Sequence, residues 1–374
     1  MAAERPTPEY HLLVKPAGAD CNAACDYCFY LRAGRLYDDA PHRMTEEVLR
    51  AFIPPFLAEG HPVSVFCWQG GEPTLMGLPF FRTVVRLQQE HGADGQLVGN
   101  ALQTNGVLID EEWARFLAEY RFLVGLSIDG PEEIHDAHRR RADGSGTWGH
   151  AIRTAGLLRE HGVEFNILSV VNSTVAERGR EVYRWLVGQG FRHLQFIQCA
   201  EVGPDGELAP WAVTPEAYGR FLCEVFDEWA DGGYPDVSVR TFDHFLSLAA
   251  GRKTGLCIFD DACEGHLVIE HNGDVYPCDF FVREDTKLGN VLVDDIRDLA
   301  RSRGRAEFAA AKGAARAACG DCRFWPICHG GCVKDREARC VPSPAEQPTI
   351  YCESYRRFFA HSRGWFEKAA RALV

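Results

Sequence analysis

The sequence predicts an α/β protein: a partial (β/α)6 barrel of the TIM type, followed by a smaller cysteine-rich domain with a β-hairpin and helices. Residues 11–201 alternate short apolar runs with amphipathic segments, which is typical of βαβ units and a parallel sheet. Six such units are too few to close a TIM barrel. Nine of the fifteen cysteines then fall between residues 257 and 352. We therefore expect two domains, spanning residues 1–235 and 236–374.

The barrel elements are expected in a regular order. The predicted strands are His11–Pro16, Val63–Gln69, Gln96–Thr104, Phe122–Ile128, Val163–Val171 and His193–Gln198. The predicted helices between them include Glu46–Leu57, Phe80–Glu90, Glu111–Tyr120, Trp148–Glu160 and Ala176–Gly188. In such sheets the ligand site lies at the carboxyl ends of the strands.

The pattern changes after residues 204–210. Pro215–Ala230 and Thr241–Ala250 are predicted helices, and the alanine-rich stretch Ala306–Ala318 is another. Between them, His266–Glu270 and Asp274–Pro277 flank an Asn-Gly dipeptide, which predicts a β-hairpin.

Composition limits the classes of partner. The formal net charge is −13 and no block of lysine or arginine is present, so binding to nucleic acid or to an acidic membrane has little electrostatic support. No apolar stretch is long enough for a signal core or a membrane span. We expect a soluble cytoplasmic protein, in which clustered cysteines bind metal or iron–sulfur clusters rather than form disulfides.

Three cysteines lie directly after the first predicted strand. Cys21, Cys25 and Cys28 place three thiols within eight residues. A [4Fe–4S] cluster normally takes four thiolates, so three would leave one iron open to another ligand. The alternative is a structural zinc site with a distant fourth ligand.

The CxxxCxxC spacing, with Tyr27 before the third cysteine, resembles the radical S-adenosylmethionine (radical SAM) superfamily. That resemblance implies that the open iron binds S-adenosylmethionine, whose reductive cleavage gives a 5′-deoxyadenosyl radical. It also implies cofactor contacts from motifs at the strand ends. These residues are Tyr27, Gly70, Gly71, Glu72, Gln103, Asn105, Ser127, Asp129, Arg139 and Ile197. Arg139 could instead be a solvated charge on a helix, and Ile197 could be an ordinary core residue.

The C-terminal cysteines resemble the SPASM domain of peptide-modifying radical SAM enzymes. The spacing Cys319-x2-Cys322-x5-Cys328-x3-Cys332 is joined by four further cysteines, enough for two fully ligated [4Fe–4S] clusters. The resemblance implies one cluster on Cys257, Cys263, Cys278 and Cys332, and the other on Cys319, Cys322, Cys328 and Cys352. A zinc ribbon would leave four of the eight unexplained. Cys340 has no assigned role, and Cys67, Cys199 and Cys223 are expected to be buried small apolar residues.

Within this class, residues 8–360 resemble the anaerobic sulfatase-maturating enzymes. The matching text includes Trp68–Leu75, Leu102–Gly106, the Ser127–Asp136 segment, Gln195–Ile197 and Glu270–Asp274 followed by Cys278-Asp279. The resemblance implies oxidation of a sulfatase cysteine or serine to Cα-formylglycine, with Asp279 as the base that takes the substrate proton. It further implies S-adenosylmethionine and three [4Fe–4S] clusters as cofactors. The expected partners are a peptide or unfolded sulfatase and a reductant such as flavodoxin or ferredoxin.

Several alternatives stay open at this point. Asp279 could be an ordinary polar residue, and Tyr30 and Gln69 either line the peptide channel or pack around the first cluster. The same cysteine pattern suits enzymes that crosslink or epimerise ribosomal peptides. A non-enzymatic electron carrier or zinc-stabilised module would cleave no S-adenosylmethionine.

Overall fold

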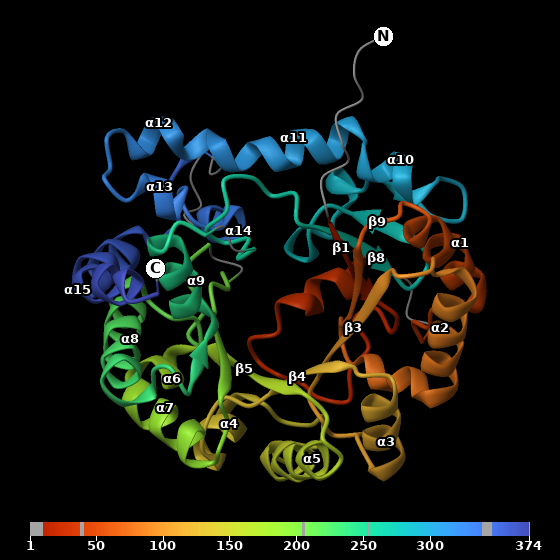
Figure 1. Cartoon of the computed structure of the whole chain (residues 1–374), viewed down its shortest axis with the longest axis horizontal. Coiled ribbons are helices and arrows are strands. Elements are labelled where there is room, and N and C mark those ends of the chain that lie inside the picture. The colour runs from red at the N-terminus through yellow and green to blue at the C-terminus, as the bar shows by residue number, and fades with distance from the viewer. Residues whose placement is uncertain (1–9, 38–40, 204–205, 253–254, 339–345, 374) are drawn as a thin grey trace.

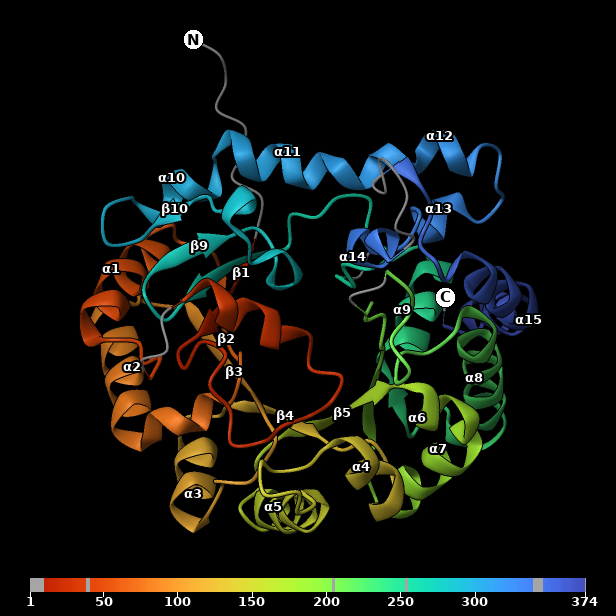
Figure 2. The same ribbon diagram turned by 180° about the vertical axis from the view of Figure 1, so that it is seen from behind.

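The computed structural model confirms the predicted fold class (Figure 1). It describes residues 10–37, 41–203, 206–252, 255–338 and 346–373. A curved sheet lines the centre of the molecule, and helices surround it on the outside in both views (Figures 1 and 2).

The sheet is a single ten-stranded array in the order β10-β9-β8-β1-β2-β3-β4-β5-β6-β7, so it ends in two edges and does not close. Its barrel strands are β1 (His11–Lys15), β2 (Val63–Trp68), β3 (Leu97–Thr104), β4 (Leu123–Ser127), β5 (Phe165–Val171), β6 (His193–Gln198) and β7 (Ser238–Val239). All of these pair in parallel. The six predicted strands are confirmed, and the short β7 was not predicted.

The outer helices follow the strands as expected for βα units. They are α1 (Glu46–Leu57), α2 (Gly77–His91), α3 (Glu111–Glu119), α4 (Glu132–His138), α5 (Trp148–Glu160), α6 (Ser173–Glu177), α7 (Gly179–Gly188) and α8 (Pro215–Glu228). The 3-10 helices η1 (Phe29–Leu36) and η2 (Pro73–Met76) lie in the loops after β1 and β2.

Local sequence explains where several helices begin. Thr45 and Thr214 each cap a helix by accepting a hydrogen bond from the backbone N–H three residues on, and Pro215 opens α8 at a position that needs no donor. One expected helix is divided: Ala176–Gly188 is part of α6 and all of α7, which meet at Arg178. Gly179 lies so close to Phe221 of α8 that a β-carbon there would be 2.8 Å from the ring, so glycine allows α7 to approach α8.

The core lies between the sheet and the helices. Alternate residues of the strands, such as Leu12, Val14, Phe66 and Trp68, are fully buried against the helices. Phe52 of α1 belongs to the same layer. The period of two along each strand sends the other residues toward the barrel interior, where the ligand site is expected.

The C-terminal region continues the barrel sheet rather than forming a separate one. The predicted hairpin is present as β8 (His266–Glu270) and β9 (Asp274–Tyr276), followed by β10 (Gly289–Asn290). β8 pairs in parallel with β1, which sets Glu270 opposite Lys15. The proposed boundary at residue 235 stays a prediction.

Helices complete this region. They are η3 (Trp229–Gly233), α9 (Arg240–Ala249), η4 (Asp279–Phe281), η5 (Glu284–Thr286), α10 (Ile296–Ala300), α11 (Arg303–Ala311), η6 (Lys312–Ala315), α12 (Arg316–Cys319), α13 (Trp325–Cys328), α14 (Val333–Glu337) and α15 (Cys352–Arg371). The long helix α15, which the sequence analysis missed, packs against α8 and α9. Within the described part of the chain, no helix has the length and apolar character needed to span a bilayer.

Candidate functional site

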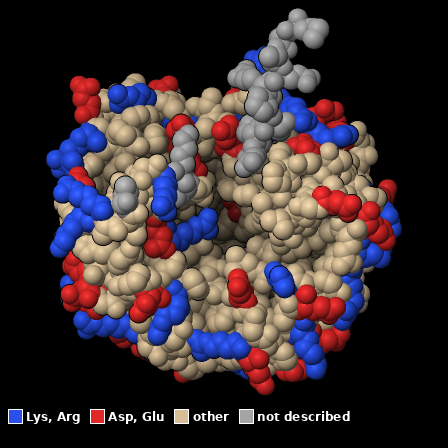
Figure 3. Space-filling view, in the orientation of Figure 1, with Lys and Arg blue, Asp and Glu red and all other residues tan. Residues whose placement is uncertain are grey.

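The carboxyl ends of the parallel strands bring the predicted site residues together. Lys15 ends β1, Ser127 ends β4, and Gln69 and Asn105 directly follow β2 and β3. The space-filling view is hollowed near the centre of this molecule, inside the ring of helices (Figure 3). The site therefore lies where an open parallel barrel is expected to bind its ligand.

The three-cysteine loop follows β1 and is held by the barrel. The backbone N–H of Ala24 donates to the carbonyl of Arg140 (2.6 Å), and Asn105 Nδ2 lies 3.6 Å from Cys21 Sγ. Burial, Glu72 and the thiols of Cys25 and Cys28 together raise the pKa of Cys21 to about 12, with burial as the largest cause. Three thiols that destabilise one another's negative charge fit a site whose thiolates the cationic iron–sulfide core of a cluster would neutralise.

Gly70 and Gly71 follow β2 and contact this loop by backbone alone. Gly71 N–H donates to the carbonyl of Gly18 (2.8 Å), and a β-carbon on Gly71 would lie 2.0 Å from the carbonyl oxygen of Asp20. Only glycine allows this approach. The position of the residue next to Cys21 therefore depends on Gly71.

Glu72 is buried, and both of its carboxylate oxygens accept hydrogen bonds within the protein. Its carboxylate accepts hydrogen bonds from the hydroxyls of Thr74 (2.6 Å) and Thr104 (2.8 Å) and from the N–H of Asn105 (2.8 Å). Burial raises its pKa, and these hydrogen bonds oppose the increase. Glu72 thus joins the loop after β2 to the end of β3, and its predicted cofactor contact stays a prediction.

Gln103, Asn105 and Ser127 form a polar row across the strand ends. Gln103 Nε2 donates to Ser127 Oγ (3.2 Å), and Asn105 Nδ2 donates to Asn22 Oδ1 (2.8 Å). Ile197 of β6 is half-buried and pairs with Val170 of β5. The row supplies amide and hydroxyl groups suited to a ribose or a carboxylate.

Asp129 and Arg139 form a buried ion pair beside Cys25. Asp129 is 0% exposed and accepts from Arg139 Nε (2.8 Å) and Nη2 (3.2 Å), and the hydroxyl of Tyr27 donates to it as well. Burial alone would raise the pKa of Asp129, but the charge and hydrogen bonds of Arg139 reverse this and hold the pKa below its ordinary value. Arg139, 7% exposed, is therefore not a solvated helix charge.

Asp279 follows Cys278 in the chain and lies beside Lys15 at the carboxyl end of β1. Its Oδ2 is 3.3 Å from Nζ of Lys15, and its side chain is 15% exposed. Lys15 Nζ also lies 4.4 Å from the ring centroid of Tyr30, whose hydroxyl donates to the buried carboxylate of Glu270. Gln69, half-buried, donates its N–H to the carbonyl of Val14 (2.9 Å).

Lys15 was missed by the sequence analysis. The signal was a lysine at the end of an otherwise apolar strand, followed at once by a proline. It is 1% exposed, so a charged partner was to be expected. The structure identifies that partner as Asp279.

The eight C-terminal cysteines are divided in space into two sets of four. We call Cys257, Cys263, Cys278 and Cys332 the hairpin set. Burial most strongly raises the pKa of Cys332, and the thiols of Cys257 and Cys263 raise it further. Burial likewise raises the pKa of Cys278, and the nearby thiols of Cys257 and Cys332 also raise it.

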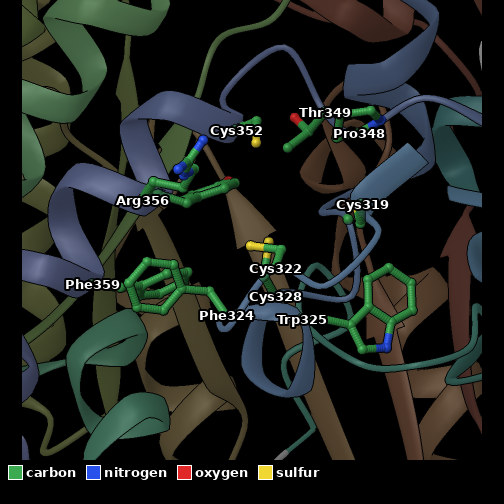
Figure 4. A pocket seen from close by; sticks show the side chains of 12 residues that line it. Cys319, Cys322, Phe324, Trp325, Cys328, Pro348, Thr349, Cys352, Arg356 and Phe359 are labelled. Atoms are coloured by element: carbon green, nitrogen blue, oxygen red, sulfur yellow. The ribbon is translucent and has the colours of Figure 1, made fainter. Parts of the chain in front are cut away.

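We call Cys319, Cys322, Cys328 and Cys352 the helix set. They line one cavity together with the apolar rings of Phe324, Trp325 and Phe359 (Figure 4). Cys352, at the start of α15, faces Cys322 and Cys328 across it (Figure 4). Burial, as the largest cause, and the other three thiols of the set together raise the pKa of Cys328 to about 12. The division agrees with the predicted ligand sets, and an enclosed group of four thiols fits a [4Fe–4S] cluster.

The remaining cysteines have no place in these groups. All fourteen cysteines in the described part of the chain are free of disulfides. Cys199 and Cys223 are buried as expected, whereas Cys67 is only half-buried. Cys340 lies outside the described residues. Among the described residues, no three His, Cys, Asp or Glu side chains are gathered closely enough to hold a single metal ion.

Two buried cations at these sets were also missed. Lys312 and Arg336 are both 0% exposed. Lys312 Nζ donates to the carbonyl of Cys257, and the Arg336 guanidinium donates to the carbonyls of His329 (3.0 Å), Gly330 and Gly331 (3.2 Å each). No sequence pattern marks either residue as buried.

Comparison with known proteins agrees with this geometry. Residues 16–186 match the Radical SAM superfamily, and residues 257–323 match the SPASM iron–sulfur cluster-binding domain. The cysteine-type anaerobic sulfatase-maturating enzyme of Clostridium perfringens is 37% identical over 366 residues, covering 95% of this chain and 96% of the relative. The serine-type enzyme of Bacteroides thetaiotaomicron is 35% identical over 383 residues, covering 97% and 92%.

Solved structures show the same relationship. The structure described as "Native anSMEcpe with bound AdoMet and Cp18Cys peptide" has a TM-score of 0.89 at 36% identity, covering 98% of this chain and all of that one. Streptococcus suis SuiB bound to S-adenosylmethionine has a TM-score of 0.67 at 18% identity, covering 92% and 77%, and shows only a shared fold. The chain therefore belongs to the anaerobic sulfatase-maturating enzymes, a family of radical SAM oxidoreductases with a SPASM iron–sulfur domain.

Proposed function

We propose that this enzyme oxidises a cysteine or serine of a sulfatase to Cα-formylglycine, starting with removal of a hydrogen atom from the substrate Cβ. The observation that carries the proposal is the position of Asp279. Its carboxylate follows Cys278, a predicted cluster ligand, and lies 3.3 Å from the buried Lys15 at the carboxyl end of β1. A substrate side chain bound at the carboxyl ends of the strands would meet a fixed proton acceptor there.

The cofactors of this site are assigned as S-adenosylmethionine and three [4Fe–4S] clusters. Cys21, Cys25 and Cys28 would hold the first cluster, and the hairpin and helix sets would hold one cluster each. When bound, these groups supply the one-electron chemistry and the radical that removes the hydrogen atom. The bare backbone of Gly70 and Gly71 and the polar row on β3 and β4 would orient the methionine and ribose parts of the cofactor.

The chain's own acid–base chemistry centres on Asp279. Its carboxylate would accept the proton of the substrate thiol or hydroxyl. An ordinary aspartate is a weak base for a thiol, with pKa values of about 3.9 and 8.5, so its position next to the substrate must make up much of the difference. Lys15 holds the carboxylate in place, and Tyr30 and Glu270 in turn enclose the lysine.

The expected partners follow from the same assignment. The substrate is a peptide or an unfolded sulfatase segment, and a flavodoxin or ferredoxin supplies electrons. The acidic net charge of −13 supports neither nucleic acid nor an anionic membrane as a partner. A cytoplasmic location agrees with clustered cysteines that bind metal, because that compartment keeps thiols reduced.

The test is anaerobic reconstitution with iron, sulfide, S-adenosylmethionine and two peptides, Cys-x-Pro-x-Arg and its serine counterpart. Mass spectrometry is expected to find 5′-deoxyadenosine together with the mass change of formylglycine formation in at least one peptide. Full turnover to 5′-deoxyadenosine with both peptides intact would exclude the sulfatase assignment. In that case a ribosomal precursor peptide is the substrate to try.

A further inference from the structure

Lys312 is a buried cation whose closest partner is a carbonyl group. It opens η6, in the helical segment that runs along one side of the molecule from α11 to α12 (Figures 1 and 2). Its side chain is 0% exposed, and Nζ donates to the carbonyl of Cys257. Among the described residues, no carboxylate lies within the 4 Å of an ion pair with it.

A buried charge without a counter-charge is costly, so another negative group must neutralise Lys312. Asp260 is the carboxylate that its charge affects, yet burial still leaves the pKa of Asp260 above its ordinary value. The hydrogen bond of Lys312 goes to the backbone of Cys257, and the backbone N–H of Cys263 donates to the carbonyl of Ala309 (3.3 Å), three residues before Lys312. Two cysteines of the hairpin set are therefore bound to the segment that carries Lys312.

Arg336 supplies a second positive charge on the same side. Its guanidinium donates to three successive carbonyls of residues 329–331, the loop that separates Cys328 of the helix set from Cys332 of the hairpin set. Gly330 approaches it so closely that a β-carbon there would lie 2.9 Å from Nη2. The charge of Arg336 interacts with thiols of both sets, whereas Lys312 acts on the hairpin set.

We propose that Lys312 is the fixed counter-charge of the cluster held by the hairpin set, and that it raises the reduction potential of this cluster selectively. Adding one electron makes a cluster more negative, and a nearby buried cation stabilises that reduced form. The cluster beside Asp279 is thereby set to take the electron that a substrate-derived radical releases as it is oxidised. This inference rests on the proposed function, because it assumes a cluster on these four cysteines.

The test compares Lys312→Met with Lys312→Arg in the full-length, cluster-loaded protein. Methionine keeps the length and burial of the side chain without its charge, and arginine keeps the charge. Lys287→Met is the matched control, since Lys287 is a half-exposed lysine of the same region that pairs with the carboxylate of Asp274 (2.6 Å). Midpoint potentials are measured by redox titration followed by electron paramagnetic resonance.

The expected result is selective. In Lys312→Met, one of the three reduction waves moves to a more negative potential by at least a tenfold change in equilibrium constant, which is about 59 mV for one electron. The potentials of the other two waves in Lys312→Met stay close to those of the wild-type protein. In Lys312→Arg and Lys287→Met, all three potentials do. No shift in Lys312→Met, or an equal shift of all three waves, would overturn the proposal.

Iron content separates this inference from the function on which it rests. A wild-type protein that holds only one cluster would refute the cluster assignment itself. If Lys312→Met loses iron, retention in Lys312→Arg decides the same question: retained iron shows that the positive charge is required, and equal loss in both variants shows that the side chain has only a packing role.

Discussion

A buried positive charge lies beside the three-cysteine loop and another beside the hairpin set of cysteines, and the two charges have different partners. Beside Cys25, Arg139 is buried but paired with Asp129 through two hydrogen bonds of 2.8 and 3.2 Å. Beside Cys257, Lys312 is 0% exposed, and among the described residues its hydrogen bond goes to a carbonyl and no carboxylate pairs with it. The first region neutralises its own cation, whereas in the second we propose that a cluster does so.

This difference follows from what each region must bind. Both regions are assigned a permanently bound cluster, but the first also receives a cofactor that enters, reacts and leaves. A cation that depended on this cofactor for its counter-charge would be unpaired after each turnover. A permanently bound anionic cluster can serve as a counter-charge throughout the life of the protein. On this proposal, a buried cation without a carboxylate partner marks a site whose anionic ligand stays bound.

The largest effect is expected from removing a ligand of the first site. Cys25→Ala should abolish 5′-deoxyadenosine formation to below detection, because the remaining two thiols cannot hold the cluster that activates the cofactor. Iron bound by the two C-terminal sets should remain. Anaerobic chromatography and iron analysis measure both quantities, and Cys223→Ala, a buried cysteine on α8, is the control. Normal cleavage in Cys25→Ala would refute the assignment of this loop.

Asp279→Asn is expected to lower formylglycine formation by at least about 100-fold, the usual contribution of a positioned base. Cofactor cleavage should persist in part, since Asp279 contacts Lys15 and Cys278 rather than the first cysteine loop. Peptide mass spectrometry alongside 5′-deoxyadenosine measurement separates the two activities. Asp285→Asn, on an exposed side chain six residues away, should be neutral. Unchanged peptide oxidation would show that another group takes the proton.

Much of the fold could be predicted from the sequence because strand and helix periods are local properties. The limits of β6 and of α1 and α5 agree to the residue with those expected, and the Asn-Gly dipeptide marked the β8–β9 turn. The pairing of β8 with β1 could not be foreseen, since it joins residues more than 250 positions apart. Helix α15 was missed although its buried residues, among them Tyr355, Phe359 and Phe366, recur at the spacing of a helix.

Site residues that form a motif with regular spacing could be predicted from the sequence. Site residues whose role depends on burial were missed. The cysteines could be found from their intervals. Their division into two sets, which the family resemblance implied, coincides with their positions in the structure, and their role as cluster ligands stays a prediction. Lys15, Lys312 and Arg336 could not be found, because a charged residue in a sequence is normally read as exposed. Their burial is set by tertiary packing of segments that lie far apart in the chain.

Asp129→Asn tests the region in which a carboxylate neutralises the buried Arg139. The change leaves Arg139 buried without its counter-charge, so we expect a loss of about 3–5 kcal/mol in the free energy of unfolding, with or without clusters. Thermal or urea unfolding followed by circular dichroism measures it. A loss of similar size in Asp143→Asn, an exposed aspartate of the neighbouring loop, would show that the effect is not specific to the pair.

The same pair predicts a pH dependence. The folded pKa of Asp129 lies below its unfolded value of about 3.9. The pair therefore contributes its full stabilisation above that unfolded value, and the contribution is lost as the pH falls through the lower folded pKa. In Asp129→Asn this component of acid unfolding should be absent, which a comparison of unfolding at pH 7 and below about pH 4 can detect. An identical acid profile in both proteins would contradict the ionised pair.

Lys312→Met gives the smallest effect but the sharpest test, because its sign should depend on the clusters. Without clusters the wild-type protein keeps an uncompensated buried cation, so methionine is expected to stabilise the cluster-free protein by about 1 kcal/mol or more. With clusters the cation has its counter-charge, and methionine should be neutral or destabilising. Unfolding of both forms, with Lys287→Met as control, measures the reversal. If Lys312→Met changes the free energy of unfolding in the same direction in both forms, the clusters do not neutralise Lys312. The contrast between the two regions would then be wrong.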